Sequence, residues 1–276
     1  MAGISTMTRP RVDTRRVRQH FSGHACEYER YAVVQKRAVA GLLHMLGRLP
    51  SSDGPVLEVG SGTGELSRRF REEYPGVPLT LSDIAHGMTR RAAGSVAMVT
   101  AVDADAQDLP FRSAGFDLVI SSSVYQWVND LKRAFAESAR VLAPGGRFAL
   151  VLFGGNTLRE LRDCHGRALA EAGRASGSHM QAFPTVGEVR DALLGAGLEV
   201  LELRSFDEVE HHPDVSALLR NLKRIGAQNA SSSRPSGLAS RRVMQRMAQL
   251  YREIHGSSDT IPATYEVVCA LGRKSG

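Results

Sequence analysis

The sequence predicts an α/β fold, with helices on both faces of a mostly parallel β-sheet. Short apolar segments with the length of buried strands alternate with longer segments whose apolar residues recur at helical spacing. The first apolar segment also runs directly into a glycine-rich turn, Gly60-Ser61-Gly62-Thr63-Gly64, which precedes a helical segment. Because strands joined by helical crossovers run parallel to one another, this alternation predicts a parallel sheet.

Length and composition fit one globular domain with an insertion. The chain has 276 residues, of which 42% are hydrophobic and 23% are charged, as is typical of soluble globular proteins. Cys26, Cys164 and Cys269 lie far apart, which excludes a disulfide framework or zinc-ribbon spacing and favours a reducing cytoplasm. No apolar run reaches the roughly 18 residues of a membrane helix. The net charge of +6 favours an anionic partner without naming one.

Up to residue 153, strands and helices follow one another in turn. Apolar residues at helical spacing predict a helix over 14–47, and Pro, Ser and Gly predict a loop over 50–55. Strands are expected at 56–59, 79–83, 97–102, 116–121 and 147–153, and helices at 65–73, 86–93 and 130–142. The last of these helices is expected to end at a turn, Pro144-Gly145-Gly146.

Beyond residue 153 the pattern changes. Helices are expected at 157–173 and 186–196, and strands at 198–209 and 265–271. About 55 residues separate these two strands, whereas connections usually have roughly 2 to 6 residues. We therefore expect an insertion at 211–260, with helices near 214–225 and 239–254, that forms a cap over the sheet.

The glycine-rich turn is the strongest signal for a ligand, because glycines let a ligand lie against bare backbone. Since position 65 is Glu, the turn lacks the G-x-G-x-x-G spacing of a dinucleotide site, and no Lys-Ser/Thr pair follows it as in a P-loop. Glu58, just before the turn, would repel a pyrophosphate and attract an ammonium group. These residues favour a nucleoside with a cationic arm, although a tight turn in any α/β fold could explain the glycines alone.

Two acids follow at the ends of the next strands. Asp83 ends the second strand, where a carboxylate can accept hydrogen bonds from both hydroxyls of a ribose. Asp105 follows the third strand, where it could accept from an adenine amino group while the backbone N–H of Ala106 meets a ring nitrogen. Each acid alone could be a helix cap or a turn former, but the ordered set is much less common by chance.

With these residues, the chain resembles the class I S-adenosylmethionine-dependent methyltransferases. The resemblance rests on segments 56–64, 83–88, 105–111, 116–122 and 140–147. It implies a Rossmann-like, seven-stranded sheet with an antiparallel last strand, with S-adenosylmethionine as cofactor and S-adenosylhomocysteine as product. By position it implies these cofactor-binding residues: Glu58, Gly60, Ser61, Gly62, Asp83, Ile84, Met88, Asp105, Ala106, Ser121 and Ser122. Ser122 departs from the Asn of many relatives, which puts a side-chain role there in doubt.

The outer segments are similar to the malonyl-[acyl-carrier protein] O-methyltransferase family of biotin synthesis. The similar segments are 21–35, 121–130, 156–161, 183–184, 218–227 and 264–268. The similarity implies methylation of the free carboxylate of malonyl-phosphopantetheine on an acidic acyl carrier protein. We accordingly expect a cytoplasmic monomer with no nucleic-acid or membrane partner. Cys26, where Ala or Thr is usual, and the loop 229–237 depart from the family pattern.

The resulting map has a single methyltransferase domain over 1–276. It contains an N-terminal helical lid at 11–47, a cofactor-binding core at 50–155 and the helical cap insertion at 211–260.

The expected chemistry needs neither a metal nor a general base, because a carboxylate with a pKa near 4 is already anionic at neutral pH. Catalysis then depends on orientation and exclusion of water. Tyr28 and Gln126 are the expected positioning residues, and Trp127 would line the acyl pocket. Arg220 or Lys223 would bind the malonyl carboxylate or the acidic surface of the carrier. Packing roles for the aromatic residues and a solvated helix face for the cations are open alternatives.

Other functions also stay open at the level of sequence. The acceptor could be another small acid or a quinone precursor, and a non-catalytic S-adenosylmethionine-binding protein would keep the same turn and acids. Nucleic-acid methylation rests on the basic charge alone, because no Asn-Pro-Pro-Tyr-type motif follows the fourth strand.

Overall fold

The computed structural model describes residues 12–24, 28–47, 54–174, 182–227 and 240–276. The strands are β1 (Val56–Val59), β2 (Leu79–Asp83), β3 (Val99–Asp103), β4 (Phe116–Ser122), β5 (Leu142–Phe153), β6 (Leu198–His212) and β7 (Ile261–Lys274). The helices are α1 (Thr14–His24), α2 (Tyr28–Tyr31), α3 (Val33–Leu46), α4 (Glu65–Glu73), α5 (His86–Ser95), the 3-10 helix η1 (Tyr125–Trp127), α6 (Leu131–Val141), α7 (Arg159–Glu171), α8 (Val186–Gly195), α9 (Val215–Arg224) and α10 (Ser240–His255).

The seven strands form one sheet in the order β3-β2-β1-β4-β5-β7-β6. Strands β1 to β5 pair in parallel, whereas β7 runs antiparallel to both β5 and β6. This confirms the predicted class I methyltransferase sheet with its antiparallel last strand. The strand order reverses between β1 and β4, and ligands of such sheets bind beyond the carboxyl ends of the strands at this point.

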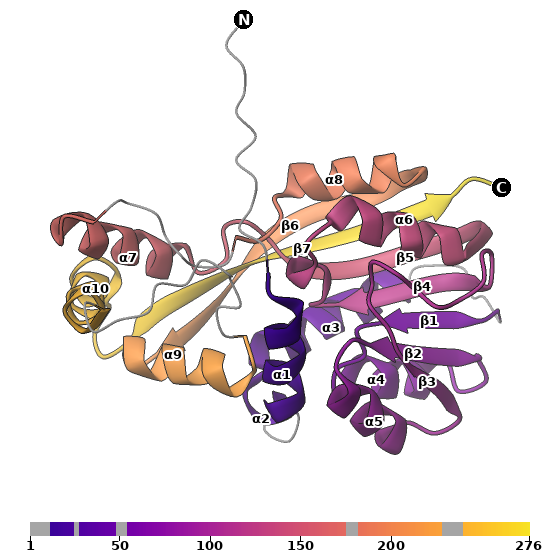
Figure 1. Cartoon of the computed structure of the whole chain (residues 1–276), viewed down its shortest axis with the longest axis horizontal. Coiled ribbons are helices and arrows are strands. Elements are labelled where there is room, and N and C mark those ends of the chain that lie inside the picture. Colours follow the sequence, from indigo (N-terminus) through magenta and orange to yellow (C-terminus); the bar gives the residue numbers. More distant parts are fainter. Residues whose placement is uncertain (1–11, 25–27, 48–53, 175–181, 228–239) are drawn as a thin grey trace, which may run out of the picture.

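Helices cover both faces of the sheet, so that its strands have two apolar sides (Figure 1). Alternate residues of β5 point to opposite faces. Leu150 packs in a buried cluster with Phe135 of α6 and Leu193 of α8. Val151 packs in the other cluster, which contains Leu42 of α3. The β5 sequence, apolar at every position from Phe148 to Phe153, is the pattern expected of a strand buried on both faces.

The last two strands are longer than predicted and extend past the rest of the sheet (Figure 1). Their ladder continues to the pair His212 and Ile261, whereas the sequence predicted strands only at 198–209 and 265–271. The additional residues, 210–212, 261–264 and 272–274, lack the alternation of apolar and polar side chains that predicts a strand, so their pairing depends on the partner strand. The insertion helices lie at this end, with α10 against α7 and α9 against α2 and β6.

The predicted continuous helix over 14–47 is wrong. The segment forms three helices, and Ala32 between α2 and α3 lies outside the helical region with φ −83° and ψ 55°. Ala32 is buried, so tertiary packing sets this break. A break of this kind leaves the apolar spacing intact on either side, which is why the sequence pattern did not reveal it.

The Pro144-Gly145-Gly146 turn is part of the irregular start of β5 instead of preceding it. Gly145 has a φ of +77°, and the register of β5 against β4 shifts between Phe116 and Leu118. Cys26 and the loop 229–237 lie outside the described residues.

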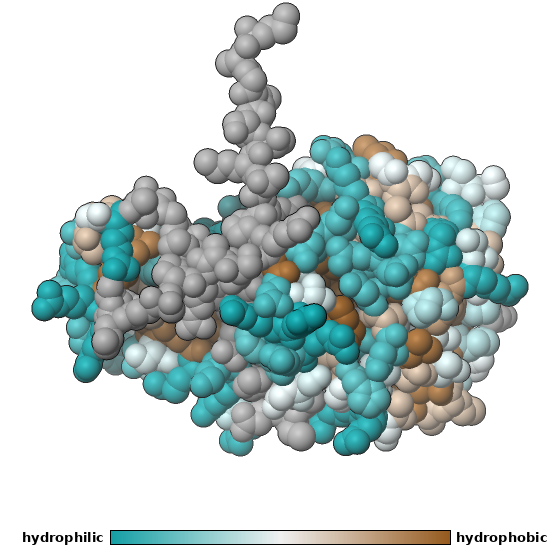
Figure 2. Space-filling model, viewed as in Figure 1, coloured by the Kyte–Doolittle hydropathy of each residue, from teal (hydrophilic) through white to brown (hydrophobic). Residues whose placement is uncertain are grey.

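Hydrophilic side chains cover most of the described surface on the face shown in Figure 2. Among the helices of the described residues, none is both long and apolar enough to cross a membrane.

Candidate functional site

A cavity lies beyond the carboxyl ends of β1 to β4, where the sheet meets the N-terminal helices. Its walls include most of the predicted cofactor-binding residues: Glu58, Gly60, Ser61, Gly62, Asp83, Ile84, Met88, Asp105, Ala106 and Ser122. The predicted substrate-side residues Tyr28 and Trp127 also line it. The fold therefore brings together residues from four strand ends and from the N-terminal helices at the switch point of the sheet.

The glycine-rich turn forms one wall of the cavity. The backbone N–H groups of Gly60 and Ser61 donate to the Ser82 carbonyl at 2.7 and 2.9 Å, which holds the turn against β2. A Cβ atom on Gly60 would lie 2.0 Å from a methyl carbon of Val124, so this position has no room for a side chain. At Gly62, in contrast, an added Cβ would meet no atom within 4 Å. Bare backbone thus faces the cavity, as a closely approaching ligand requires.

Glu58 is a buried acid at the end of β1, with 1% of its surface exposed. The Ser67 hydroxyl donates to its carboxylate. Burial raises the pKa of Glu58 from its ordinary value of 4.5 to about 8, and the nearby charge of Asp83 acts in the same direction, although the Ser67 hydrogen bond opposes them. A cationic ligand group would favour the charged carboxylate, so the site suits the ammonium group that the sequence predicted.

Asp83 lies where β2 meets the cavity. Gly62 N–H donates to one carboxylate oxygen at 2.9 Å, and Ala85 N–H donates to the other at 2.8 Å. Burial raises the pKa of this acid to about 6, against the lowering effect of the backbone hydrogen bonds. Each oxygen keeps a further lone pair, and together the two oxygens can accept from a pair of vicinal hydroxyls.

The loop after β3 forms the opposite end of the cavity. The Asp105 carboxylate accepts from the Gln107 backbone N–H at 2.9 Å and from its side-chain amide at 3.1 Å. The Gln107 side-chain oxygen in turn accepts from Asp130 N–H at 2.9 Å, which fixes the loop to the start of α6. Ala106 and Met88 are both buried wall residues. Flat apolar surface beside a fixed carboxylate suits a purine ring with an amino group.

Aromatic residues from three separate segments meet at the cavity. The Phe21 ring of α1 lies edge-on to Trp127, with centroids 5.5 Å apart, and Tyr28 of α2 is 6.4 Å from Phe21. Trp127 also contacts Phe183, at 5.9 Å. Burial, followed by the charge of Asp83, raises the pKa of Tyr28, so its hydroxyl stays protonated at neutral pH. These rings give the cavity an aromatic wall on the side of the N-terminal helices.

Two sets of hydrogen bonds hold the N-terminal helices over the cavity. Val12 N–H donates to the Asn129 side-chain oxygen at 2.7 Å, and the Asn129 amide donates to the Val12 carbonyl at 3.0 Å. Arg68 of α4 pairs with Glu29 of α2 at 3.0 Å and donates to the Thr63 carbonyl in the glycine turn at 3.0 Å. The N-terminal helices are therefore tied both to the glycine-rich turn and to the segment that follows η1.

Four predicted residues do not line the cavity. The buried Ser121 hydroxyl donates to the Val59 carbonyl at 2.7 Å, so its side chain joins β4 to β1. Gln126 is buried within η1. Arg220 and Lys223 are exposed on α9. The roles assigned to these four residues stay predictions.

The sequence did not single out several of the wall residues, among them Glu29, Gln35, Lys36 and Gln107. Tyr28 and Gln35 reach the cavity from two different helices, α2 and α3, so helical spacing along the sequence could not have revealed them as one face. The ion pair between Arg68 and Glu29 has no sequence-local signal, because the two residues belong to different helices.

A family model described as "Methyltransferase domain" matches residues 57–150. Malonyl-[acyl-carrier protein] O-methyltransferase of Geobacter sulfurreducens is 45% identical, over 95% of this chain and 100% of that protein. The protein of the same name from Hahella chejuensis is 34% identical, over 98% of this chain and 94% of its own length. The biotin biosynthesis bifunctional protein BioHC of Saccharophagus degradans is 32% identical, over 91% of this chain and 45% of that protein.

Solved structures show the same fold. The YcgJ protein of Bacillus subtilis matches with a TM-score of 0.59 at 18% identity, over 86% of this chain and 98% of that one. A Haemonchus contortus N-methyltransferase in complex with S-adenosylhomocysteine matches with a TM-score of 0.52 at 18% identity, over 86% of this chain and 52% of that one. Because it is 45% and 34% identical to the first two of these relatives over nearly its full length, the chain belongs to the malonyl-[acyl-carrier protein] O-methyltransferase family.

Proposed function

We propose that this chain transfers a methyl group from S-adenosylmethionine to the free carboxylate of malonyl-acyl carrier protein. The products are the malonyl-acyl carrier protein methyl ester and S-adenosylhomocysteine, at the start of biotin synthesis. The observation that carries the proposal is the cavity at the carboxyl ends of the strands. In addition, the chain is 45% identical, over 95% of its length, to a malonyl-[acyl-carrier protein] O-methyltransferase.

The residues of the cavity fit the parts of S-adenosylmethionine. The methionine arm would lie against the backbone of Gly60, Ser61 and Gly62, with its ammonium group near Glu58. Asp83 would accept from the ribose hydroxyls. On the adenine side, Ile84 and Met88 would pack against the ring, and Asp105 with Ala106 would bind its edge. The backbone around Ser121 and Ser122 would flank the methionine end. The open space at Gly62 and the buried acid Glu58 support this assignment.

When bound, the cofactor supplies an electrophilic methyl group on a sulfonium. A malonyl carboxylate oxygen would take up that methyl group as the carbon–sulfur bond breaks, so one negative and one positive charge would be lost together. Because charge is lost on the way to the transition state, surroundings with little water would favour the reaction. Tyr28, Phe21 and Trp127 would supply such surroundings, and no proton has to be moved by the protein.

Two buried groups are assigned positioning roles. Tyr28 reaches the cavity from the lid with a hydroxyl that stays protonated, so it can donate a hydrogen bond to an acceptor carboxylate. Gln126 is next to Trp127 on η1 and would set the orientation of this short helix. Trp127 itself would form the wall of the acyl pocket.

The carrier would dock beside the lid on α1 and α9, neither of which contains an acidic residue. The two helices meet, because a Cβ on Gly226, just after α9, would lie 3.3 Å from the His20 carbonyl oxygen. Arg224 lies 4.5 Å over the Tyr31 ring of α2. Arg220 and Lys223 are exposed on the same helix, so this surface suits an acidic protein.

We also propose that the chain is divided as predicted into a lid (11–47), a cofactor-binding core (50–155) and a cap insertion (211–260), and that it is located in the cytoplasm. Free, buried Cys164 and Cys269 suit a reducing compartment.

The function can be tested in a biotin-requiring bacterium that lacks its own malonyl carrier methyltransferase. Expression of this chain should restore growth without biotin, and the Asp83→Ala variant, made to the same level, should not. Failure of the wild-type chain to restore growth, while it is soluble and binds S-adenosylmethionine, would count against the malonyl acceptor and leave another small acid or a quinone precursor as the acceptor.

A further inference from the structure

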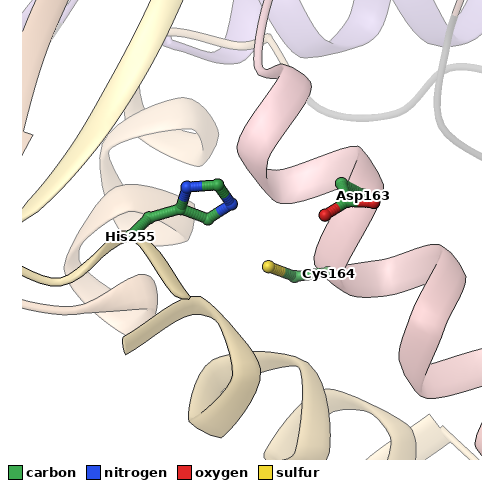
Figure 3. A group of neighbouring side chains, drawn as sticks. All are labelled: Asp163, Cys164 and His255. Carbon is green, nitrogen blue, oxygen red and sulfur yellow. The ribbon is translucent and has the colours of Figure 1, made fainter. Parts of the chain in front are cut away.

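Three potential metal ligands meet between α7 and α10, outside the cofactor cavity. Asp163 and Cys164 are neighbours on α7, and His255 is the last residue of α10. Their ligand atoms all lie within 4.8 Å of one another. Figure 3 shows the three side chains converging from the two helices, with one imidazole nitrogen directed toward Cys164 and Asp163.

The imidazole of His255 carries a polar atom that needs a partner. Its Nε2 is buried and has no hydrogen-bond partner among the described residues. A buried nitrogen without a partner costs free energy comparable to a lost hydrogen bond. A metal ion would satisfy this nitrogen, because a neutral imidazole nitrogen is a common metal ligand.

The ligand set selects a class of metal. Sulfur, imidazole nitrogen and carboxylate oxygen together suit Zn²⁺, whereas Mg²⁺ and Ca²⁺ prefer oxygen alone. A tetrahedral zinc ion with bonds of about 2.0 to 2.3 Å holds its donor atoms roughly 3.5 Å apart. The three donor atoms would need to move only about 1 Å closer to one another to reach this geometry.

An ion pair on Asp163 orients the carboxylate of the cluster. Arg167 Nε pairs with one oxygen of Asp163 at 2.9 Å, which leaves the other oxygen for a metal and orients the carboxylate. Partners of this kind commonly hold metal-binding carboxylates in place. One carboxylate and one thiolate neutralise a 2+ ion.

We propose that Asp163, Cys164 and His255 bind one zinc ion that clamps the insertion to the rest of the molecule. As the metal–sulfur bond forms, the Cys164 thiol gives its proton to solvent, and a water molecule occupies the fourth position. The chain enters β7 soon after His255, so the clamp fixes α10 where the insertion rejoins the sheet. The role is structural and separate from methyl transfer.

Sequence spacing alone predicted no metal, because the ligands do not form a short motif. Cys164 and His255 are separated by α8, β6, α9 and most of α10. Only the packing of α10 on α7 brings them together. That packing is independently supported by an ion pair of 2.6 Å between Arg246 and Glu171.

The test uses the full-length chain, first stripped with a chelator and then given Zn²⁺, Co²⁺ or Mg²⁺. Zn²⁺ should bind at about one ion per chain and raise the melting temperature by several degrees, as a ligand specific to the native state does. Co²⁺ should show a sulfur-to-cobalt charge-transfer band. Mg²⁺ should do neither.

Cys164→Ala and His255→Asn should each weaken Zn²⁺ binding roughly tenfold or more, since each removes one of three protein ligands. Cys269→Ala is the matched control, because it removes another buried free thiol, on β7, and should leave binding unchanged. The proposal is overturned if Cys164→Ala binds Zn²⁺ as the wild-type chain does, or if folded wild-type protein binds no Zn²⁺ or gives no cobalt–sulfur band. Cofactor affinity, measured in the same variants, should not change.

Discussion

At the scale of single residues, the cavity contains two acids that are both held away from water. Glu58 ends β1 and Asp83 ends β2, and burial raises the pKa of each, to about 8 and about 6 respectively. Burial disfavours the charged form of each acid, so ionisation of Glu58 destabilises the ligand-free protein. The cationic methionine arm would favour the ionised Glu58 carboxylate, so this acid links the stability of the protein to its cofactor.

This linkage predicts how the stability of the ligand-free chain depends on pH. In the folded state Glu58 keeps its proton to about pH 8, whereas the unfolded chain releases it near 4.5. The folded state thus binds more protons in this window, and stability must fall as pH rises through it. Asp83 contributes a similar fall that ends at about pH 6.

Glu58→Gln should therefore remove most of the fall between pH 6 and pH 8, while the fall below pH 6 due to Asp83 persists. The change is of order 2 kcal/mol, or a few degrees in melting temperature. Thermal denaturation without cofactor checks this. An equally steep fall in Glu58→Gln would show that another group is responsible.

A second prediction concerns the ribose contacts of Asp83. Asp83→Ala should weaken S-adenosylmethionine binding by at least roughly 100-fold, because two hydrogen bonds to a charged group are lost at about 1.5 to 3 kcal/mol each. Asp103→Ala is the control. Asp103 ends the adjacent strand and pairs with His86 at 2.8 Å but does not line the cavity. Calorimetric titration measures both variants, and near-normal affinity in Asp83→Ala would show that the site is misplaced.

These acids could be predicted from the sequence because each lies at or next to the carboxyl end of a strand with a clear apolar pattern. The carboxyl ends of parallel strands meet at one edge, so order along the chain sets position in space. No such rule links Arg68 to Glu29, or Phe21 to Trp127, and both contacts emerged only from the fold.

At the scale of elements, the N-terminal helices form one side of the cavity. They contribute Phe21, Tyr28 and Glu29 to its walls. Val17 and Phe21 pack with Trp127, and polar contacts join Val12 to Asn129 and Glu29 to Arg68. If this segment opens locally to admit ligands, the polar contacts are among those that must break.

Asn129→Ala should therefore lower kcat/KM by about tenfold, because two hydrogen bonds of roughly 1 kcal/mol each hold the lid closed. Hydrogen exchange should increase over α1 and α2. The matched control is Gln249→Ala, which removes an exposed hydrogen bond to Glu253 on α10. Unchanged kcat/KM and exchange in Asn129→Ala would exclude this contact as a lid attachment.

The lid also shows a limit of prediction at this scale. The apolar residues of segment 14–47 follow one helical period, yet the chain turns between α1 and α3 so that Phe21 and Tyr28 face the same cavity. The break satisfies tertiary contacts rather than local preference. The strands of the core, whose apolar runs are uninterrupted, were in contrast placed within a few residues.

At the scale of the whole molecule, two neighbouring helices, α1 and α9, contain basic residues and no acidic ones. Arg220 and Lys223 are exposed on α9, beside the acid-free helix α1. If an acidic carrier docks there, its affinity should fall as salt screens the charges, while the enclosed cofactor should be less sensitive.

Replacement of both Arg220 and Lys223 by Glu should raise the KM for malonyl carrier at least roughly tenfold, because attraction becomes repulsion at two sites. The dissociation constant for S-adenosylmethionine should not change. Arg190→Glu on α8 is the control, because it reverses an exposed charge away from α1 and α9. Equal KM values for the double variant and the control would place the carrier elsewhere.

The architecture as a whole followed from alternation, the glycine turn and family resemblance, while the insertion was harder to predict. Sequence length between β6 and β7 indicated extra helices but not that α10 would pack on α7. That contact depends on apolar faces of two helices far apart in the chain. For the same reason, the sequence could not predict that Cys164 and His255 lie close together.

The most direct test of the proposed activity follows labelled methyl groups from S-adenosylmethionine in the presence of malonyl-acyl carrier protein, with acetyl-acyl carrier protein as control. Label should appear on the malonyl carrier alone and be released by mild base, as a methyl ester would be. Equal labelling of the acetyl carrier, or none on the malonyl carrier by a folded chain that binds the cofactor, would contradict carboxyl methylation of the malonyl group.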